Sequence, residues 1–279
     1  MAVNNFIPTI WSANLLKERD RISIAVANCN KNWEGEIKSV GDKVKINAIS
    51  DVTLSDYTKN STTISYPSLD DNSAMLEITE AKYFAFSVED VDKLQTKGDF
   101  KAEAIRRSAT VLSNTADQFV YGLYAEAGAT VTQGSLTSGN ITSTISSALT
   151  ALLANDVPEG MERYLEVTPA VYEKMVLAGI IKSYENDARL VSGSVGQYLG
   201  FKVFVSNNIS GASGTGVHYC YARTKDAITF AEQINKMEAV RLETKFADGV
   251  RGLHLYGAKV IRPKELVTLA LTTTSETAI

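Results

Sequence analysis

The stretch DFKAEAIRRSATVLSNTADQFVYGLYAEA, residues 99–127, decides the fold of this chain. Apolar or small residues recur in it every three or four positions, which places them on one stripe of a helix. The members of the stripe are Ala102, Ile105, Ala109, Leu112, Ala116, Phe119, Leu123 and Ala127. The polar residues that fall largely off the stripe are Lys101, Arg106, Arg107, Asn114, Asp117, Gln118 and Glu126. The spacing predicts one long helix.

The residues that flank this helix predict where it begins and ends. Asp99 is the predicted N-cap, because its carboxylate can accept hydrogen bonds from the N–H groups of the first turn. Gly128 is the predicted residue just past the end, since glycine enters the left-handed conformation without a Cβ clash. At about 1.5 Å per residue the helix would reach roughly 40 Å. A helix of this length predicts a strut that carries other elements.

Length and composition narrow the class of protein. The 279 residues allow one large domain or two lobes, and 44% hydrophobic with 22% charged residues is typical of a core-forming chain. A net charge of −4 argues against a nucleic-acid-binding protein with a basic patch. No apolar run is long enough to span a bilayer, and residues 1–11 lack the features of a signal peptide. Cys29 and Cys220 predict free thiols in an intracellular chain.

The chain before the long helix predicts an arm followed by a projecting hairpin. Residues 1–30 indicate an extended arm that leads into a short helix. Residues 36–49 alternate between apolar and polar side chains, as a half-buried strand does. Residues 74–78 and 82–88 predict the returning strands, with the polar stretch 51–71 as a wide tip. Because an isolated hairpin is only marginally stable in water, we expect this one to lean on a neighbouring chain.

The chain after the long helix predicts a mixed lobe with local hairpins rather than repeated βαβ units. One helix is expected over residues 140–155, with Asn140 as its cap, and another starts at Thr168-Pro169. The predicted strands are residues 164–167, 201–205, 217–222, 227–230, 237–242 and 253–261. The predicted loops are residues 129–139, 184–200, 207–216 and 247–249, and Pro263 ends the run before a tail over 272–279. The fold class is therefore α+β.

No reactive constellation stands out among the histidines and cysteines. His218 and Cys220 lie two apart in a predicted strand, so both project from one face, but no third group that would orient a catalytic pair is apparent. His254 lies in another predicted strand. A zinc site needs more ligands at closer spacing than two cysteines and two histidines provide. The sequence predicts packing roles for these residues.

Other motif-like stretches also lack the context that chemistry requires. Gly211, Gly214 and Gly216 give the dinucleotide fingerprint in the wrong order, and a strand rather than a helix is expected to follow them. Ser194 lacks the glycine two positions before it that a nucleophile elbow requires. The acidic pair Asp70-Asp71 is expected to be solvated. We therefore predict no enzyme and no catalytic, cofactor-binding or metal-binding residue, and the projecting elements suggest assembly.

The order of parts resembles the major capsid proteins (coat proteins) of tailed bacteriophages. Several stretches carry the resemblance, and in order they are NFIPTIWSA (5–13), GDKVKI (41–46), KYF (82–84), VEDVDK (88–93) and Ala116-Asp117. The resemblance extends from residue 1 to about residue 272. It implies the α+β fold labelled HK97-like, in which an N-terminal arm, an extended β-hairpin loop and a long spine helix accompany a mixed α/β axial domain.

The resemblance also implies a division of the chain. Residues 1–30 would form the arm and short helix, and residues 31–88 the extended hairpin loop. Residues 89–139 would form the peripheral domain with the spine helix, and residues 140–232 the axial domain. Residues 233–279 would return to the peripheral domain and end in the tail.

The implied function is that of a structural protein of a virion. Such a chain self-assembles as hexamers and pentamers into an icosahedral head that encloses double-stranded DNA without sequence-specific binding, and assembly takes place in the cytoplasm of the host bacterium. The implied partners are further copies, a scaffolding protein that is separate or already removed, a portal and, as an optional partner, a decoration protein. No cofactor or membrane is implied.

Two alternatives stay open, and one family property is not carried over. The same fold would serve an encapsulin-type nanocompartment shell, and a lower alternative is a hydrolase that uses Cys220 and His218. Some relatives cross-link a loop lysine to an asparagine. Lys43, Lys45 and Lys59 lie in or near the loop here, but nothing identifies their partner.

Overall fold

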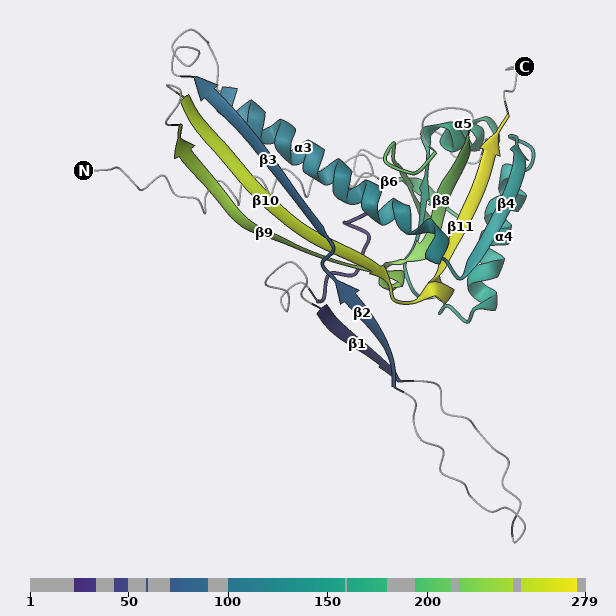
Figure 1. Cartoon of the computed structure of the whole chain (residues 1–279). Helices are drawn as coiled ribbons and strands as arrows, with labels where there is room; N and C mark the ends of the chain where they lie inside the picture. The colour runs from purple at the N-terminus through teal and green to yellow at the C-terminus, as the bar shows by residue number, and fades with distance from the viewer. Residues whose placement is uncertain are drawn as a thin grey trace.

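A computed structural model shows an elongated part, a lobe and a hairpin that projects away from both (Figure 1). The elongated part holds a long helix and a three-stranded sheet, and the lobe holds a six-stranded sheet with two helices. The predicted α+β class is confirmed. The structure describes residues 23–33, 43–49, 59, 71–89, 100–158, 160–179, 194–211, 216–242 and 247–274. Most of the predicted arm and most of the hairpin tip lie outside these residues.

The helices and strands of the described residues follow in chain order. The α-helices are α3 (Phe100–Tyr121), α4 (Ile141–Ala154) and α5 (Pro169–Leu177), and the 3-10 helices are η2 (Gly122–Glu126), η3 (Lys225–Ala227) and η4 (Pro263–Glu265). The strands are β1 (Lys43–Ile49), β2 (Asp71–Glu77), β3 (Glu80–Glu89), β4 (Ala129–Leu136), β5 (Arg163–Val167), β6 (Ser194–Tyr198), β7 (Phe201–Val205), β8 (Val217–Thr224), β9 (Ile228–Arg241), β10 (Ala247–Val260) and β11 (Leu266–Thr273).

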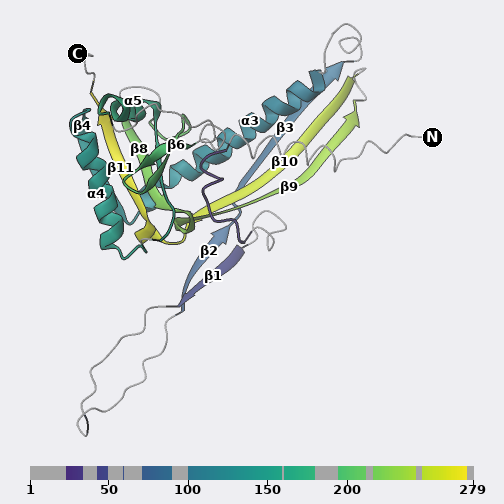
Figure 2. The same ribbon diagram turned by 180° about the vertical axis from the view of Figure 1, so that it is seen from behind.

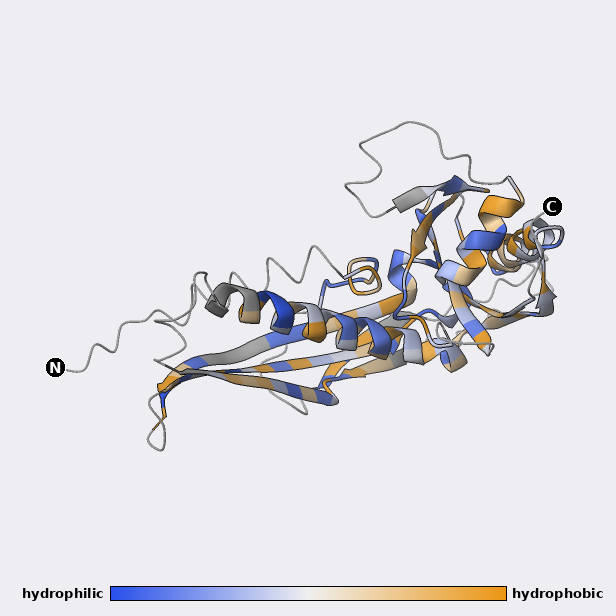
Figure 3. Cartoon of the chain, turned by 90° about the horizontal axis from the view of Figure 1, so that it is seen from above, coloured by the Kyte–Doolittle hydropathy of each residue, from blue (hydrophilic) through white to orange (hydrophobic). Residues whose placement is uncertain are grey.

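The long helix α3 lies along one face of the sheet β3-β10-β9 (Figure 3). The predicted apolar stripe faces this sheet, because Ala109 and Leu112 are buried and pack with Phe84 of β3. Phe84 and Phe86 share a face, as predicted, with ring centroids 6.4 Å apart. The stripe continues through Ala116, which is buried where the helix reaches the lobe.

Three details of the predicted long helix are wrong. The α-helix ends at Tyr121, and the chain continues as the 3-10 helix η2. Gly128 is not a helix cap, since its N–H donates to the Pro263 carbonyl at 2.9 Å and a Cβ there would lie 2.5 Å from that oxygen. Asp117, expected off the stripe, is also buried (1% exposed), because residues 23–26 lie over it and hydrogen-bond to its carboxylate. The predicted cap Asp99 lies outside the described residues.

The lobe is a six-stranded sheet with covered faces, in the order β4-β11-β8-β5-β7-β6. Helices α4 and α5 cover one face, where Ile145, Leu152 and Met175 join one apolar core with the strands. The end of α3 and residues 25–29 cover the other face, where Tyr221 joins a second core. The lobe therefore packs on the elongated part through the end of α3 (Figure 2).

The two helices of the lobe agree with the sequence, apart from one cap. The side chain of Thr168 accepts a hydrogen bond from the N–H of Val171, and Pro169 occupies the first helical position. Asn140 does not cap α4 with its side chain. Instead its amide group accepts from the Thr137 N–H and donates to the Ser135 carbonyl, each at 2.8 Å.

Several loop and strand predictions after the long helix are wrong. Residues 129–139, predicted as a loop, contain β4, which pairs in parallel with β11. The predicted loop over residues 184–200 contains β6. The strands expected at residues 227–230 and 237–242 are one strand, β9, and β10 already begins at residue 247. Strand β11 was not predicted, although its apolar sequence LVTLAL is typical of a central strand.

The projecting hairpin consists of β1 and β2 alone. Their register runs from Lys43 opposite Glu77 to Ile49 opposite Asp71, which confirms the predicted pairing of these segments. The returning strand expected at residues 82–88 belongs to β3 instead, and β3 pairs with β10. Because β4 and β11 both join the six-stranded sheet, the lobe also takes strands from outside residues 140–232.

Candidate functional site

The base of the hairpin is fastened to the sheet. One face of β1 and β2 buries Val44, Ile46 and Leu76, which pack with Leu255 of β10. The backbone of β2 crosses β10 closely, because a Cβ at Gly257 would lie 2.2 Å from the Glu77 carbonyl oxygen. The opposite face of the hairpin is exposed and includes Lys43, Lys45 and Met75, the last with 55% exposure.

A buried carboxylate fastens the start of the described chain to the long helix. Asp117 of α3 accepts a hydrogen bond from the Ser23 hydroxyl at 2.6 Å. It also accepts from the backbone N–H groups of Ile24, at 3.1 Å, and Val26, at 3.2 Å. Two backbone N–H groups and one hydroxyl thus donate the hydrogen bonds that satisfy this buried carboxylate. Residues 23–26 are held against the helix in this way.

A buried ion pair fastens the same segment to the lobe. The Arg223 guanidinium donates through Nε and Nη2 to the two Glu166 carboxylate oxygens at 3.1 and 2.8 Å. It also donates to the backbone carbonyls of Ala25 and Asn28 at 2.9 and 3.0 Å. The Asn28 side chain in turn donates to Glu166 at 2.8 Å. We call these residues, together with Asp117, the arm joint.

The electrostatics of the arm joint keep its charges in place. Arg223 and Glu166 are both fully buried. Burial opposes the charge on Arg223, but the Glu166 carboxylate outweighs that effect and holds the pKa of the guanidinium above its ordinary value. Burial raises the pKa of the Cys29 thiol beside it, so that Cys29 stays neutral at pH 7. Because every donor faces an acceptor, the joint fixes the position of residues 25–28.

A second contact holds the segment beside the hairpin base. Asn30 forms an isolated parallel bridge with Thr229 of β9. The Lys31 ammonium lies 3.6 Å from one oxygen of Glu232, whose other oxygen lies 3.2 Å from Nε2 of His254. His254 thus contacts a carboxylate within the sheet, and the segment that leads to the hairpin is tied to β9.

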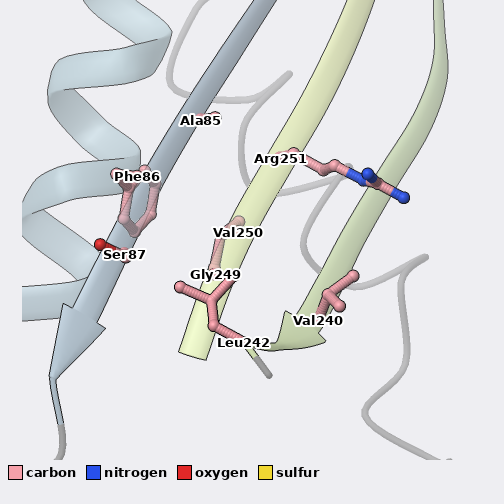
Figure 4. A pocket seen from close by; sticks show the side chains of 8 residues that line it. All are labelled: Ala85, Phe86, Ser87, Val240, Leu242, Gly249, Val250 and Arg251. Carbon is pink, nitrogen blue, oxygen red and sulfur yellow. The ribbon is translucent and has the colours of Figure 1, made fainter. Parts of the chain in front are cut away.

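Part of the face of the three-stranded sheet opposite α3 is exposed in the described part of the chain. Side chains alternate across a strand, so Tyr83 and Arg251 point away from the helix side on which Phe84 lies. Tyr83 is 79% exposed. Arg251 extends across β9 beside a hollow of about 350 Å³ that is lined by apolar side chains such as Val240 and Leu242 (Figure 4). The guanidinium pairs with Glu238 of β9 at 2.6 Å.

The proposed catalytic pair lies inside the lobe. His218 and Cys220 are both buried on β8, and Cys220 belongs to the apolar core under α4 and α5. Burial raises the pKa of Cys220 to about 12 and lowers the pKa of His218. Nε2 of His218 faces the Thr273 hydroxyl at 3.5 Å. A neutral thiol without access to solvent is a poor nucleophile, so this arrangement favours packing over catalysis.

The other motif-like residues lie in local structures that do not match their motifs. Gly211 ends a turn that leads to β8, and Gly214 lies outside the described residues. Ser194 begins β6, which is a strand rather than a strand-to-helix turn. In the described part of the chain no three His, Cys, Asp or Glu side chains gather as metal ligands.

The loop lysines show no common site. Lys43 pairs with Glu77 across the hairpin at 3.2 Å, and both side chains are about half exposed. Lys45 and Lys59 are exposed.

Among the described residues, every helix is too short or too polar to cross a membrane.

Sequence reasoning missed the arm joint. Glu166 lies in RYLEV, a strand whose five residues are all buried, and Arg223 lies in a strand with six buried residues. A charged residue inside an apolar strand is a signal that it has a buried partner. That signal does not reveal the partner, because Glu166 and Arg223 are 57 positions apart and Asn28 is 195 positions from Arg223.

Known proteins share both the sequence pattern and the fold of this chain. A family model described as phage capsid protein matches residues 34–272. A solved structure from Mycobacterium phage Che8 is 28% identical, with a TM-score of 0.75, and the match covers 96% of this chain and 98% of that one. No relative with a curated description matches the sequence.

More distant structures share the fold alone. The capsid structure of cyanophage P-SCSP1u is 18% identical with a TM-score of 0.68, and 85% of each chain is covered. A virus-like particle from Pyrococcus furiosus is 10% identical with a TM-score of 0.59, and the match covers 92% of this chain and 96% of that one. The family model and the Che8 structure confirm the family resemblance that the sequence predicts, and the distant structures agree with the fold class.

Proposed function

Because the chain belongs to the phage capsid protein family and so has a role in the capsid shell, we propose that it forms hexamers and pentamers that build an icosahedral head around double-stranded DNA. The observation that carries this proposal is the hairpin, whose base packs on the chain's own sheet while its other face is exposed at Lys43, Lys45 and Met75. Elements of this kind gain their remaining contacts from neighbouring copies. The chain's role is then structural rather than enzymatic, and no residue serves as a catalytic, cofactor or metal site.

The face of the three-stranded sheet opposite α3 supports contact between neighbours. The base of the hairpin already covers one part of this face, through Leu76 and Leu255. The part around Tyr83, Arg251 and Val240 stays open beside the hollow. We expect the hairpin of an adjoining subunit to lie over this open part, which would bury apolar surface on both copies.

The arrangement of the sheets supports a division of the chain. We propose an arm over residues 1–30, the extended hairpin loop within 31–88, a peripheral domain around α3, and an axial domain around residues 140–232. Residues 233–279 return to the periphery, although β4 and β11 hydrogen-bond within the axial sheet. The arm joint would then set the angle at which the arm leaves the subunit.

The remaining partners and the place of assembly belong to the same proposal. The shell would be assembled in the cytoplasm of the host bacterium, with a separate scaffolding protein, a portal and an optional decoration protein. The packaged DNA would be held without sequence-specific contacts, which agrees with a net charge of −4.

Electron microscopy and light scattering of the expressed chain, with and without scaffolding protein, test the proposal. We expect closed shells that contain rings of five and six subunits. A monomer that persists at high concentration with scaffold present would contradict it. Shells that enclose a cargo protein instead of nucleic acid would favour the nanocompartment alternative.

A further inference from the structure

Gly257 lies where the hairpin leaves the three-stranded sheet. Strand β10 pairs with β3 as far as Tyr256, which lies opposite Glu80, and Gly257 is the next residue of β10. Residues 78–79 alone join β3 to Glu77, the last residue of β2. The hairpin therefore departs from the sheet without a loop that could absorb a change in its direction.

The two backbones meet at this point, and a side chain would push them apart. A Cβ on Gly257 would lie 2.2 Å from the Glu77 carbonyl oxygen and 3.1 Å from the Cα of Ile78. Both neighbours are backbone atoms, so rotation of a side chain could not make room. Glycine weakens the interior of a strand, and it often marks a place where another backbone approaches closely. The close approach explains why a glycine stands here.

The residues around the crossing are closely packed. Ala231 of β9 lies opposite Gly257 in the sheet and is fully buried. It belongs to the same apolar cluster as Leu76, Ile78 and Leu255, which join the hairpin base to the sheet. Close-packed side chains transmit a displacement instead of absorbing it. We therefore expect a change at the crossing to tilt the whole hairpin.

We propose that Gly257 is a positioning residue, whose lack of a side chain sets the angle between the hairpin and the three-stranded sheet and thereby the curvature of the shell. The inference rests on the proposed function, in which the hairpin reaches a neighbouring copy, so that its angle determines how two subunits tilt against each other. Figure 1 shows the hairpin projecting from the sheet at this crossing.

The length of the hairpin enlarges a small displacement at the crossing. A methyl group on Gly257 would push the Glu77 carbonyl away by roughly 1 Å before an ordinary contact distance is restored. The seven residues of β2 extend roughly 20 Å from there to Asp71. The resulting tilt should move the far end of β2 by about 2 Å or more.

The distance between two spin labels in the free subunit tests the angle. Asp71→Cys places one label at the far end of β2, and Val111→Cys places the other on α3, where Val111 is 63% exposed. The two native cysteines are buried, so they should not be labelled. In this background, Gly257→Ala should shift the mean distance by about 2 Å or more. An unchanged distance would overturn the inference.

A second glycine in a strand provides the matched control. Gly134 lies in β4, and a Cβ there would meet no atom of the described residues within 4 Å. Gly134→Ala should therefore leave the distance between the labels unchanged. An equal shift in both variants would overturn the inference, because the shift would then not come from the crossing.

Electron microscopy of assembled particles gives a second readout. Gly257→Ala should change the mean diameter of the shells, whereas Gly134→Ala should keep it. A role of Gly257 in stability alone would lower the yield of soluble subunits without changing the diameter. That result, or a Gly257→Ala chain that does not fold, would overturn the inference and leave the shell function standing. Failure of the unaltered chain to form any particle would instead overturn the proposed function.

Discussion

The axial sheet and the β1–β2 hairpin bury their apolar side chains in different ways. All residues of β5 and the first six of β11 are buried, because helices, strands and residues 25–29 of the same chain cover both faces. The hairpin buries one face at its base and exposes the other. The comparison teaches that one chain combines a region that is complete in itself with a region that neighbouring copies would complete in the proposed shell.

The largest expected effect comes from breaking the arm joint. Glu166→Ala leaves the Arg223 guanidinium buried without its carboxylate, and should lower the free energy of unfolding by about 3–5 kcal/mol. The exposed ion pair between Arg251 and Glu238 serves as the control. Arg251→Ala should change the free energy of unfolding by less than about 1 kcal/mol. Urea unfolding of both variants measures the difference. If the two losses were equal, the axial region would not be the self-contained one.

The hairpin base should respond more strongly than its outer face. Leu76 is fully buried, so Leu76→Ala should lower the free energy of unfolding by about 2–5 kcal/mol. Met75, its exposed neighbour, should tolerate Met75→Ala in the subunit but show a reduced yield of shells. Thermal melting and sedimentation of both variants provide the readouts. A Met75→Ala subunit that assembles at the normal yield would show that the outer face has no partner.

Alkaline pH should weaken the axial core. Burial raises the pKa of Cys220 to about 12, and burial also raises that of Cys29. Folding therefore favours the protonated thiols, and stability falls as the pH rises above the unfolded value of about 8.5. Each buried thiol should account for about 1.4 kcal/mol per pH unit above that value. Cys220→Ala should flatten the dependence of the melting temperature on pH between 9 and 10.5, and an unchanged slope would contradict the burial of this thiol.

The smallest expected effect is a gain at the link between the two regions. Gly122 begins η2, and nothing lies within 4 Å of the place where a Cβ would be. Gly122→Ala should therefore raise the free energy of unfolding by roughly 0.5–1 kcal/mol through a smaller loss of backbone entropy. Calorimetry of the subunit checks the sign. A drop in stability would indicate that the link needs a conformation that only glycine adopts.

The parts of the fold that could be predicted are those with local causes. The cap at Thr168-Pro169 and the stripe through Ala109 and Leu112 depend on residues within one or two turns of a helix. Strand β4 could not be predicted, since its Thr-Val-Thr pattern becomes a strand only beside β11, more than 130 residues later. The arm joint could not be predicted either, because its charged residues meet only in the folded chain.

The arm joint also fixes an order of events during synthesis. Asn28 leaves the ribosome 195 residues ahead of Arg223, the side chain that holds its carbonyl. At about 5–20 residues per second, the start of the chain waits roughly 10–40 s for that partner. Asp117 emerges earlier, but its hold on residues 23–26 is only half of the attachment. The complete attachment of residues 23–28 therefore forms only after β8 has been synthesised, late in the production of the chain.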